Sequence, residues 1–463
     1  MSSQGLSPAD RSSLAAERGP INMAVGGLLV FDAEPPLTRA MVAARIGERI
    51  HLIPRLRQRL EEPPLGIANP VWTDDTGFDL DWHVRQTSLP GAGGSESEAE
   101  LGRFVGREFS HRLDRSRPLW EATLIEGLEG GRAGLLMKVH HALVDGMAAI
   151  GMAALVLDPT PEPLEIPAPE EQWSPRKYDM RRHVARVASR PLARAPRMMM
   201  DGMLRALDPD PRRAAADMLK ASEVALELAR TRPQAPMTPL NRPISPNRRY
   251  GFAHVELAAI KRAGKAVGGT VNDTVLAVVA GMLSRYLADD ELAGGRRPVA
   301  LVPVSVRGTE SDPAHPDLGN RISTVFVDLP IDEPDLGARI RAIATQTREL
   351  KESAAVRAGA LMVGAAGWAP PLVSGILARA MGSVRAFNLV VSNVPGPQQP
   401  FYMNGVAMRE IYPIVPLNPA NQGLTIGILS YDGQMCFGLL ADRDLDPPLQ
   451  SAVAGLHAAL DEL

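Results

Sequence analysis

Hydrophobic and polar positions along the chain form two kinds of pattern. Short runs of aliphatic and β-branched residues predict strands over 22–31, 71–85, 120–125, 135–139, 250–257, 299–306, 323–329, 388–392, 423–430 and 434–440. Longer stretches of helical character predict helices over about 38–50, 98–109, 258–267 and 271–287. Both kinds of element occur in both halves of the chain, so the pattern predicts an α/β (α+β) protein with two similar lobes, each a mixed sheet with flanking helices.

The composition changes between Asp158 and Pro246. Prolines cluster near both ends of this stretch, and arginines are frequent between the two clusters. We interpret the stretch as a crossover linker that contains helices. The predicted organisation is therefore an N-terminal lobe over 1–157, a linker over 158–246 and a C-terminal lobe over 247–463.

Two segments raise the question of a membrane. Arg182, Arg186 and Arg190 recur every four residues and share one helix face, which suits an anionic membrane or lipid-droplet surface. A solvated linker helix is an equal alternative. Residues 358–378 carry no charge and are long enough to span a bilayer, but their glycines and the Pro370-Pro371 pair favour two buried or interfacial helices.

Composition narrows the classes of protein. A chain of 463 residues with 45% hydrophobic and 22% charged residues predicts a folded protein of two or three domains. The net charge of -3 disfavours nucleic-acid binding. The single cysteine, Cys436, excludes an internal disulfide and a cysteine-rich metal site, and the polar N-terminus lacks the order of a signal peptide, so we expect a cytoplasmic protein.

The strongest chemical signal is His140-His141 at the end of the predicted strand 135–139. A histidine there can take a proton from a hydroxyl or thiol, because its pKa lies near neutrality. Neighbouring histidines in extended chain point to opposite sides, which disfavours a shared zinc ion. Two buried histidines beside a turn at Asp145-Gly146 are the structural alternative. No GxSxG elbow and no phosphate-binding glycine pattern is evident, which weakens hydrolase and nucleotide-binding interpretations.

The HHxxxDG pattern at 140–146 resembles the active-site motif of the acyltransferase superfamily that includes chloramphenicol acetyltransferase and peptide-synthetase condensation domains. Further segments resemble the bacterial wax ester synthase/acyl-CoA:diacylglycerol acyltransferase family. They are Leu6-Ser7-Pro8 with Asp10, Pro118-Leu119-Trp120, NDTVLA at 272–277, PVSVR at 303–307 and SNVPGP at 392–397. The resemblance covers nearly the whole chain. It departs from the family at Ala24, where a histidine is common, and at Thr274, where valine is commoner.

The resemblance implies two chloramphenicol-acetyltransferase-like lobes with His141 midway along a channel. His141 would deprotonate the acceptor hydroxyl as it attacks the acyl-CoA thioester, without an acyl-enzyme. Asp145 would pair with Arg307 of the other lobe. The implied catalytic residues are His140, His141, Asp145, Gly146 and Asn272, and the implied substrate-binding residues are Glu17, Trp120, Asp273, Ser392, Asn393 and Gly396.

Several of these positions have a plainer interpretation. Asn272 would donate a hydrogen bond to the oxyanion or orient the acceptor, but Asn272-Asp273 also suits a helix N-cap. Trp120 would line the channel, whereas a core position is the ordinary place for such a ring. Residues 392–396 would line the CoA or acyl side, with a simple Pro/Gly turn as the alternative.

The implied reaction is acyl transfer from acyl-CoA to diacylglycerol, giving triacylglycerol, or to long-chain alcohols, giving wax esters. We expect no metal and no cofactor, since acyl-CoA is a substrate, and peripheral contact with a membrane or lipid inclusion. Two alternatives remain open. One is a carrier-protein-dependent condensation or polyketide-associated acyltransferase, and the other is a non-catalytic lipid-binding protein of the same fold.

Overall fold

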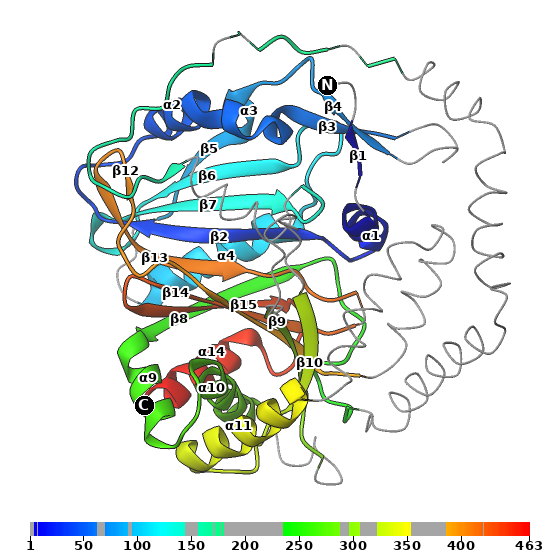
Figure 1. Ribbon diagram of the computed structural model, residues 1–463, viewed down its shortest axis with the longest axis vertical. Coiled ribbons are helices and arrows are strands. Elements are labelled where there is room, and N and C mark those ends of the chain that lie inside the picture. Colours follow the sequence, from blue (N-terminus) through cyan, green and yellow to red (C-terminus); the bar gives the residue numbers. More distant parts are fainter. Residues whose placement is uncertain are drawn as a thin grey trace, which may run out of the picture.

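Strands from both halves of the chain build two six-stranded sheets that lie one above the other with helices around them (Figure 1). The computed structural model describes residues 4–6, 8–62, 70–90, 95–143, 156–169, 171, 173–176, 178–179, 235–287, 296–305, 322–352, 386–419 and 421–463. The predicted α/β architecture with two lobes is confirmed.

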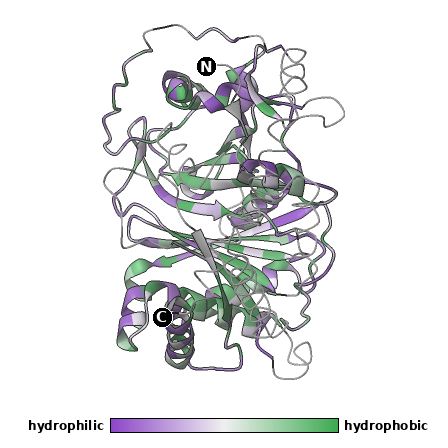
Figure 2. Ribbon diagram, turned by 45° about the vertical axis from the view of Figure 1, so that its right-hand side comes forward, coloured by the Kyte–Doolittle hydropathy of each residue, from purple (hydrophilic) through white to green (hydrophobic). Residues whose placement is uncertain are grey.

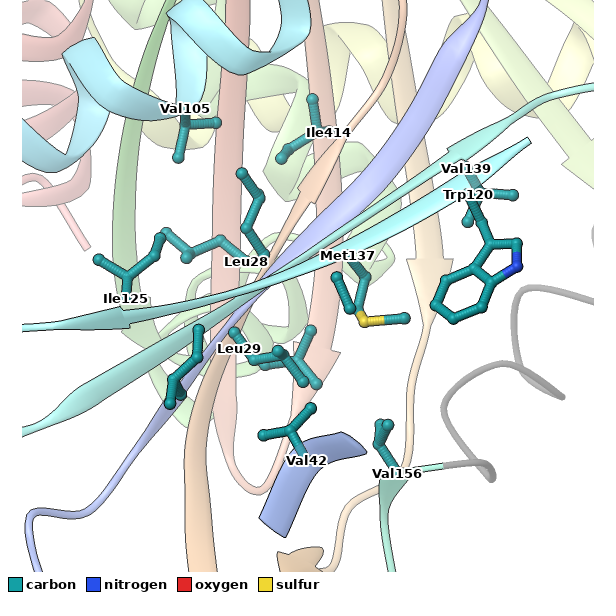
Figure 3. Packing of buried hydrophobic residues seen from close by; sticks show 14 of the residues in the cluster. Leu28, Leu29, Val42, Val105, Trp120, Ile125, Met137, Val139, Val156 and Ile414 are labelled. Carbon is teal, nitrogen blue, oxygen red and sulfur yellow. The ribbon is translucent and has the colours of Figure 1, made fainter. Parts of the chain in front are cut away.

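The first sheet has the strand order β12-β13-β2-β7-β6-β5. Its strands are β2 (Ala24–Phe31), β5 (Val84–Ser88), β6 (Trp120–Glu126), β7 (Ala133–His140), β12 (Tyr402–Met403) and β13 (Val406–Ile414). Helices α2 (Arg39–Arg49) and α4 (Ser95–Ser110) cover opposite faces. Figure 3 shows Leu28 on the side of Val105 from α4 and Leu29 on the side of Val42 from α2, as expected for successive strand residues. The apolar run of β2 is therefore buried on both faces.

The second sheet has the strand order β10-β9-β11-β14-β15-β8. Its strands are β8 (Arg248–Glu256), β9 (Val299–Ser305), β10 (Ile322–Asp328), β11 (Leu389–Pro395), β14 (Leu424–Tyr431) and β15 (Gln434–Asp442). Its helices are α9 (Leu257–Ala266), α10 (Val271–Tyr286), α11 (Leu336–Glu352) and α14 (Leu449–Leu460).

These four helices gather at the far side of the second sheet from the first (Figure 1). Figure 2 shows hydrophobic residues along the sheets and both kinds of residue on the helices. Helix α10 is the most enclosed of them, because every residue from Asp273 to Leu283 is buried. Helix α10 is therefore packed against its neighbours from its third residue, Asp273, onward.

The strand predicted over 71–85 is wrong in its middle. Strand β4 (Val71–Asp74) ends early, and helix α3 (Leu80–His83) precedes β5. The Asp75 carboxylate accepts a hydrogen bond from the Gly77 amide at 3.0 Å, and Asp79 caps α3 by accepting one from the Asp81 amide at 3.0 Å. These hydrogen bonds from backbone amides to nearby carboxylates stabilise a turn and a short helix, so the segment between β4 and β5 does not continue as a strand.

A smaller sheet lies beside the first lobe. Its order is β1-β4-β3, with β1 (Gln4–Gly5) and β3 (Gln58–Glu61) on either side of β4. Helix α1 (Pro8–Ala16) follows β1, and short 3-10 helices at Ile50–Leu52 and Pro54–Arg57 lead from α2 to β3. Helix α1 brings the chain to Glu17, one of the predicted site residues.

Strand β13 belongs by sequence to the second half of the chain but completes the first sheet. It runs antiparallel to β2, with Ile411 opposite Leu29. Where β13 passes the second sheet, Gly427 and Gly438 are directly paired on β14 and β15. A Cβ atom at Gly438 would lie 2.0 Å from the Pro413 carbonyl oxygen, so this close approach requires glycine. The predicted boundaries at 157 and 246 thus divide the sequence but not the sheets.

The two lobes also meet through α4 and β8. Cβ atoms at Gly102 and Gly106 would lie 2.5 and 2.7 Å from the carbonyl oxygens of Tyr250 and Arg248, so both glycines let the helix approach the strand. The Arg248 guanidinium donates a hydrogen bond to the Pro20 carbonyl at 2.7 Å. This contact fixes the β8 edge of the second lobe beside the chain that leads into β2.

The start of the predicted linker is anchored to the first lobe. The carboxylate of Asp158, which is 1% exposed, accepts hydrogen bonds from Arg45 and Arg49 of α2. The predicted basic helix with Arg182, Arg186 and Arg190 and the uncharged stretch 358–378 both lie outside the described residues. Among the helices that are described, none has by itself the length and apolar character needed to cross a bilayer, and the sharply bent pair α9 and α10 meets that test only when taken together.

Candidate active site

The end of β7 presents the two histidines to different surroundings. The His140 amide donates to the Leu119 carbonyl at 3.0 Å, and the His141 amide donates to the Met23 carbonyl at 2.9 Å, so neighbouring segments hold the strand end on both sides. A bond from the Leu143 amide to the His140 carbonyl at 2.8 Å closes a turn. The His140 side chain is buried, whereas that of His141 is exposed. The two adjacent histidines thus differ in burial at the point where the strand ends and the turn begins.

Hydrogen bonding determines which nitrogen of His140 carries the proton. Nδ1 accepts a hydrogen bond from the Ala142 amide at 3.0 Å. A backbone N–H can only donate, so Nδ1 is unprotonated and Nε2 bears the hydrogen. Nε2 lies 3.5 Å from Oε2 of Glu17. His140 therefore links a carboxylate to the turn that carries His141.

Glu17 is a buried, ionised carboxylate. Its Oε1 accepts a hydrogen bond from the Met23 amide at 3.1 Å, and its Oε2 accepts one from Arg115 at 3.0 Å. Burial raises the pKa of the Glu17 carboxyl, but His140, the Met23 amide and Arg115 together outweigh burial and bring the pKa down to about 2. Glu17 therefore lies beside the motif through its contact with His140, and its predicted substrate-binding role stays a prediction.

The imidazole of His141 has a lowered pKa. Desolvation by the surrounding protein is the largest influence on the pKa of its imidazole and lowers it. A hydrogen bond to its own backbone and the Asp10 carboxylate raise the pKa, the adjacent His140 ring lowers it, and the net direction is downward. Part of the side chain remains open to solvent. A lowered pKa favours the neutral form of this partly accessible ring at neutral pH, and its role as a base stays a prediction.

Lys138 and Asn22 fix the strand end to helix α4. The Lys138 ammonium donates to the carbonyls of Glu108 and His111 at 2.8 and 2.7 Å, and the Asn22 amide donates to those of Phe109 and His111 at 2.9 and 2.8 Å. The carbonyls of Glu108 and Phe109 belong to the last turn of α4, and that of His111 directly follows the helix. Burial lowers the pKa of the Lys138 ammonium. A cation at a helix C-terminus is also favoured by the helix dipole.

A second group of predicted residues lies at the beginning of α10 in the other lobe. The cap is Thr270, whose hydroxyl accepts from the Asp273 amide at 3.2 Å, while the Asp273 carboxylate accepts from the Thr270 amide at 2.8 Å. Asp273 is buried and also accepts a hydrogen bond from Thr347 of α11 at 2.8 Å. Asp273 thus completes a capping box, and Asn272 is not the cap. No described contact tests the predicted substrate role of Asp273.

The side chain of Asn272 meets that of Asn393 from β11. Nδ2 of Asn393 donates to Oδ1 of Asn272 at 3.3 Å, and both side chains are half-buried. Ser392, also half-buried, precedes Asn393 on the strand. A Cβ atom at Gly396 would lie 2.3 Å from the Ser430 carbonyl oxygen, so glycine is needed where β11 ends against β14. The segment 392–396 is therefore a strand end rather than the simple turn.

Trp120 occupies a core position. Its ring is 1% exposed, stacks on His83 at 4.5 Å between centroids and donates from Nε1 to the Leu56 carbonyl at 2.8 Å. Its partner in the sheet is Val139 of β7 (Figure 3). The described structure therefore matches the core interpretation of this residue, and a place on a channel wall stays a prediction.

The structure brings the predicted residues together in two groups. Glu17, His140 and His141 meet at the end of β7, and Asn272 and Asn393 meet between α10 and β11. Asp145, Gly146 and Arg307 lie outside the described residues, so the predicted ion pair stays a prediction. Within the part of the chain that is described, no cluster of three His, Cys, Asp or Glu side chains could hold a metal ion.

Two family models match the chain. The wax ester synthase/diacylglycerol acyltransferase catalytic domain matches residues 6–275, and the C-terminal domain of the same family matches residues 318–463. The chain belongs to this family. The resemblance found in the sequence is thus confirmed, and the wax ester synthase/diacylglycerol acyltransferase family places the protein among the O-acyltransferases.

Relatives within the family match over nearly their whole length. A Mycobacterium tuberculosis protein that bears a diacylglycerol O-acyltransferase name is 31% identical over 99% of this chain and 98% of its own. The solved wax ester synthase/diacylglycerol acyltransferase of Marinobacter aquaeolei is 29% identical, covers 99% of this chain and 98% of that one, and has a TM-score of 0.68. The first condensation domain of the calcium-dependent antibiotic synthetase shares the fold at 16% identity, with a TM-score of 0.56 over 99% of this chain and 95% of that one.

Three residues of the site were given no role by the sequence. Arg115 pairs with Glu17, and Lys138 and Asn22 hold the end of α4. The role of Lys138 could have been predicted from the sequence, because a lysine inside an apolar strand next to the motif needs buried hydrogen-bond partners. The role of Arg115 could not have been predicted in this way, because Arg115 lies 98 residues from Glu17 in the sequence, among other surface arginines.

Proposed function

We propose that this protein transfers an acyl group from acyl-CoA to the hydroxyl of diacylglycerol or of a long-chain alcohol, forming triacylglycerol or a wax ester. Membership of the family supports an ester-forming acyl transfer. The relatives' names supply the two acceptor classes. The acyl-CoA donor and the direct transfer between two bound substrates are parts of the proposal.

The observation that carries the proposal is the contrast between His140 and His141. His140 is buried and keeps its proton on Nε2 beside Glu17, whereas His141 is accessible and its pKa is lowered. Only the second ring is free to exchange a proton with a substrate. His140 and Glu17 are positioning residues in this scheme, because they hold the turn that presents His141.

The chemistry needs one base and no covalent intermediate. His141 takes the proton from the acceptor hydroxyl as the oxygen attacks the thioester carbonyl. The new carbon–oxygen bond forms, the carbon–sulfur bond breaks, and the proton passes from His141 to the departing CoA sulfur. Such proton transfer contributes roughly 10²–10⁴-fold, and holding both substrates together supplies much of the remainder.

Three features complete the proposal. The channel around His141 and the Asp145–Arg307 pair would join the lobes at the motif. Peripheral contact with a membrane or lipid inclusion would let a poorly soluble acceptor reach the site. Binding of purified protein to anionic vesicles, and its loss when Arg182, Arg186 and Arg190 are reversed to glutamate, tests the contact; unchanged binding at ordinary salt would reject that surface.

The test of the reaction is His141→Ala. The expected result is a fall in CoA release of roughly 10²–10⁴-fold with an unchanged melting temperature, because only the base is lost. Palmitoyl-CoA serves as donor, with diacylglycerol and hexadecanol offered separately, and ester products are measured beside free thiol. Unchanged turnover in this variant would remove His141 from the mechanism.

His111→Ala is the matched control. His111 is also an exposed histidine, and its described hydrogen bonds use the backbone only. We expect its substitution to leave turnover within about twofold of the wild type, as for an ordinary surface position. If the wild type forms no ester with any alcohol but retains fatty acid, the lipid-binding alternative replaces the proposal.

A further inference from the structure

The contact between Asn272 and Asn393 joins two elements that are far apart in the sequence. Asn272 is the second residue of α10, and Asn393 lies on β11, 121 residues later. Their amides meet at 3.3 Å, with Nδ2 of Asn393 donating to Oδ1 of Asn272. A bond between two half-buried amides fixes which end of each amide faces its partner.

The helix does not need the side chain of Asn272. Thr270 and Asp273 cap α10 through their reciprocal hydrogen bonds. Asn272 is therefore free to serve another purpose, and its oxygen is turned toward Asn393. The geometry of a carboxamide then directs its NH2 group, a donor of two hydrogen bonds, away from Asn393.

The position of Asn393 is itself well determined. Strand β11 runs parallel to β14 over Val390–Pro395, with Asn393 opposite Ile428. At the strand end the Gly396 amide donates to the Ser430 hydroxyl at 3.2 Å, and the close approach of Gly396 to the Ser430 carbonyl leaves no room for another residue. The donor of Asn393 is therefore held on a rigid element, as a positioning group must be.

We propose that Asn393 is a positioning residue that orients the amide of Asn272, so that the NH2 group of Asn272 faces the thioester carbonyl oxygen during acyl transfer. This inference rests on the proposed function. When the acceptor oxygen attacks, that carbonyl oxygen gains negative charge. An N–H donor stabilises the charge, whereas the oxygen of a reversed amide repels it. The orientation of one side chain thus decides the sign of its effect on the reaction.

The experiment compares Asn393→Asp with Asn393→Ala. A carboxylate has nearly the shape of the amide but only accepts hydrogen bonds, so it draws the NH2 group of Asn272 toward itself and leaves the Asn272 oxygen facing the substrate. We expect kcat to fall by roughly 10²–10³-fold in Asn393→Asp, the effect of losing one oxyanion donor. Asn393→Ala only frees Asn272 to rotate, and we expect a loss of about tenfold. KM for acyl-CoA should change little in both.

A merely structural role predicts the reverse order. The shape-preserving Asn393→Asp would then be milder than Asn393→Ala, which leaves a cavity. That order would overturn the proposal. If Asn393→Asp fails to fold, Asn393→Ser replaces it: a hydroxyl donor should give a kcat above that of Asn393→Ala, and a kcat below it would also overturn the proposal.

Double variants supply an independent readout. In an Asn272→Ala background, Asn393→Asp should cause no further loss of kcat, because the residue it positions is absent. Independent losses that multiply would contradict the proposal. Val394→Ala is the control, since Val394 is the next residue on the strand and 47% exposed. Loss of activity in His141→Ala with unchanged activity in Asn393→Asp would reject this inference alone, whereas absence of any ester from the wild type would reject the proposed function.

Discussion

The candidate site residues form two polar groups that are built on different principles. The strand-end cluster (Glu17, Arg115, His140 and His141) joins an ionised carboxylate to a guanidinium and an imidazole. The amide pair (Asn272 and Asn393) contains no titratable group and is held by one hydrogen bond. The cluster uses charge to decide where a proton resides, and the pair uses geometry to decide which way a donor points. Acid should therefore disturb the first and leave the second intact.

The largest expected effect is a difference in stability between two variants, each of which removes one of the two carboxylates that contact Arg115. Arg115 contacts buried Glu17 at 3.0 Å and exposed Glu62 at 3.1 Å. Glu17→Gln should lower the free energy of unfolding by about 3 kcal/mol, because it breaks a buried pair. Glu62→Gln should cost less than about 1 kcal/mol, since exposed pairs contribute little. Urea unfolding measures both, and equal losses would show that burial does not distinguish them.

The second prediction concerns acid. The pKa of Glu17 is about 2 in the folded protein against an ordinary 4.5. A lowered folded pKa contributes stability above pH 4.5 that is lost as the pH falls toward 2, and the difference is on the order of 3 kcal/mol. Unfolding measured between pH 4.5 and 2 should show this loss of stability in the wild type. Asn272→Ala should show the same loss, because the amide pair contains no titratable group. Glu17→Gln should flatten the dependence, and an unchanged slope would assign the acid sensitivity to other groups.

The third prediction separates the helix cap from the amide pair. Thr270→Ala should lower the free energy of unfolding by about 1 kcal/mol, the usual value of a lost N-cap. Asn272→Ala should cost less than about 0.5 kcal/mol of stability but about 10²-fold in kcat. Thermal unfolding and steady-state kinetics on the same preparations test this contrast. A larger stability loss in Asn272→Ala than in Thr270→Ala would make Asn272 structural.

The smallest predicted effect is a shift in the pH profile. His141 must be neutral to act as a base, so activity should rise with pH through its lowered pKa and then level off. The Asp10 carboxylate raises the pKa of His141. Asp10→Asn should therefore move the acid limb of kcat to lower pH and leave the plateau unchanged. Movement toward higher pH would contradict the assignment of that limb to His141.

Local patterns were sufficient for the central strands and for α10. The apolar runs that became β2, β7 and β14 are buried on both faces, so hydrophobicity alone identified them. Strand β13 was missed, because Arg409, Glu410 and Pro413 interrupt its apolar residues and a register shift lies between Met408 and Glu410. Its pairing with β2 depends on a contact between distant parts of the chain, which a local window does not contain.

The site shows the same division between local and distant information. The sequence alone correctly placed His140 and His141 at the end of a strand. The tautomer of His140 and the ionisation of Glu17 depend on Arg115 and Met23, which only the folded chain brings near. The cap of α10 could have been found locally, because Thr270 and Asp273 stand at the spacing of a capping box. The sequence analysis considered Asn272-Asp273 as the cap because these two residues begin the NDTVLA segment.

The crossing of β13 constrains how this protein is made. During synthesis the β2 edge of the first sheet remains unpaired until residues 406–414 have left the ribosome, although strands β2, β5, β6 and β7 of that sheet are complete by residue 140. At ordinary elongation rates of about 5–20 residues per second, this exposure lasts on the order of ten seconds to a minute. An open strand edge invites pairing with other chains. Nascent chains that stall before residue 406 are therefore the species most prone to aggregate.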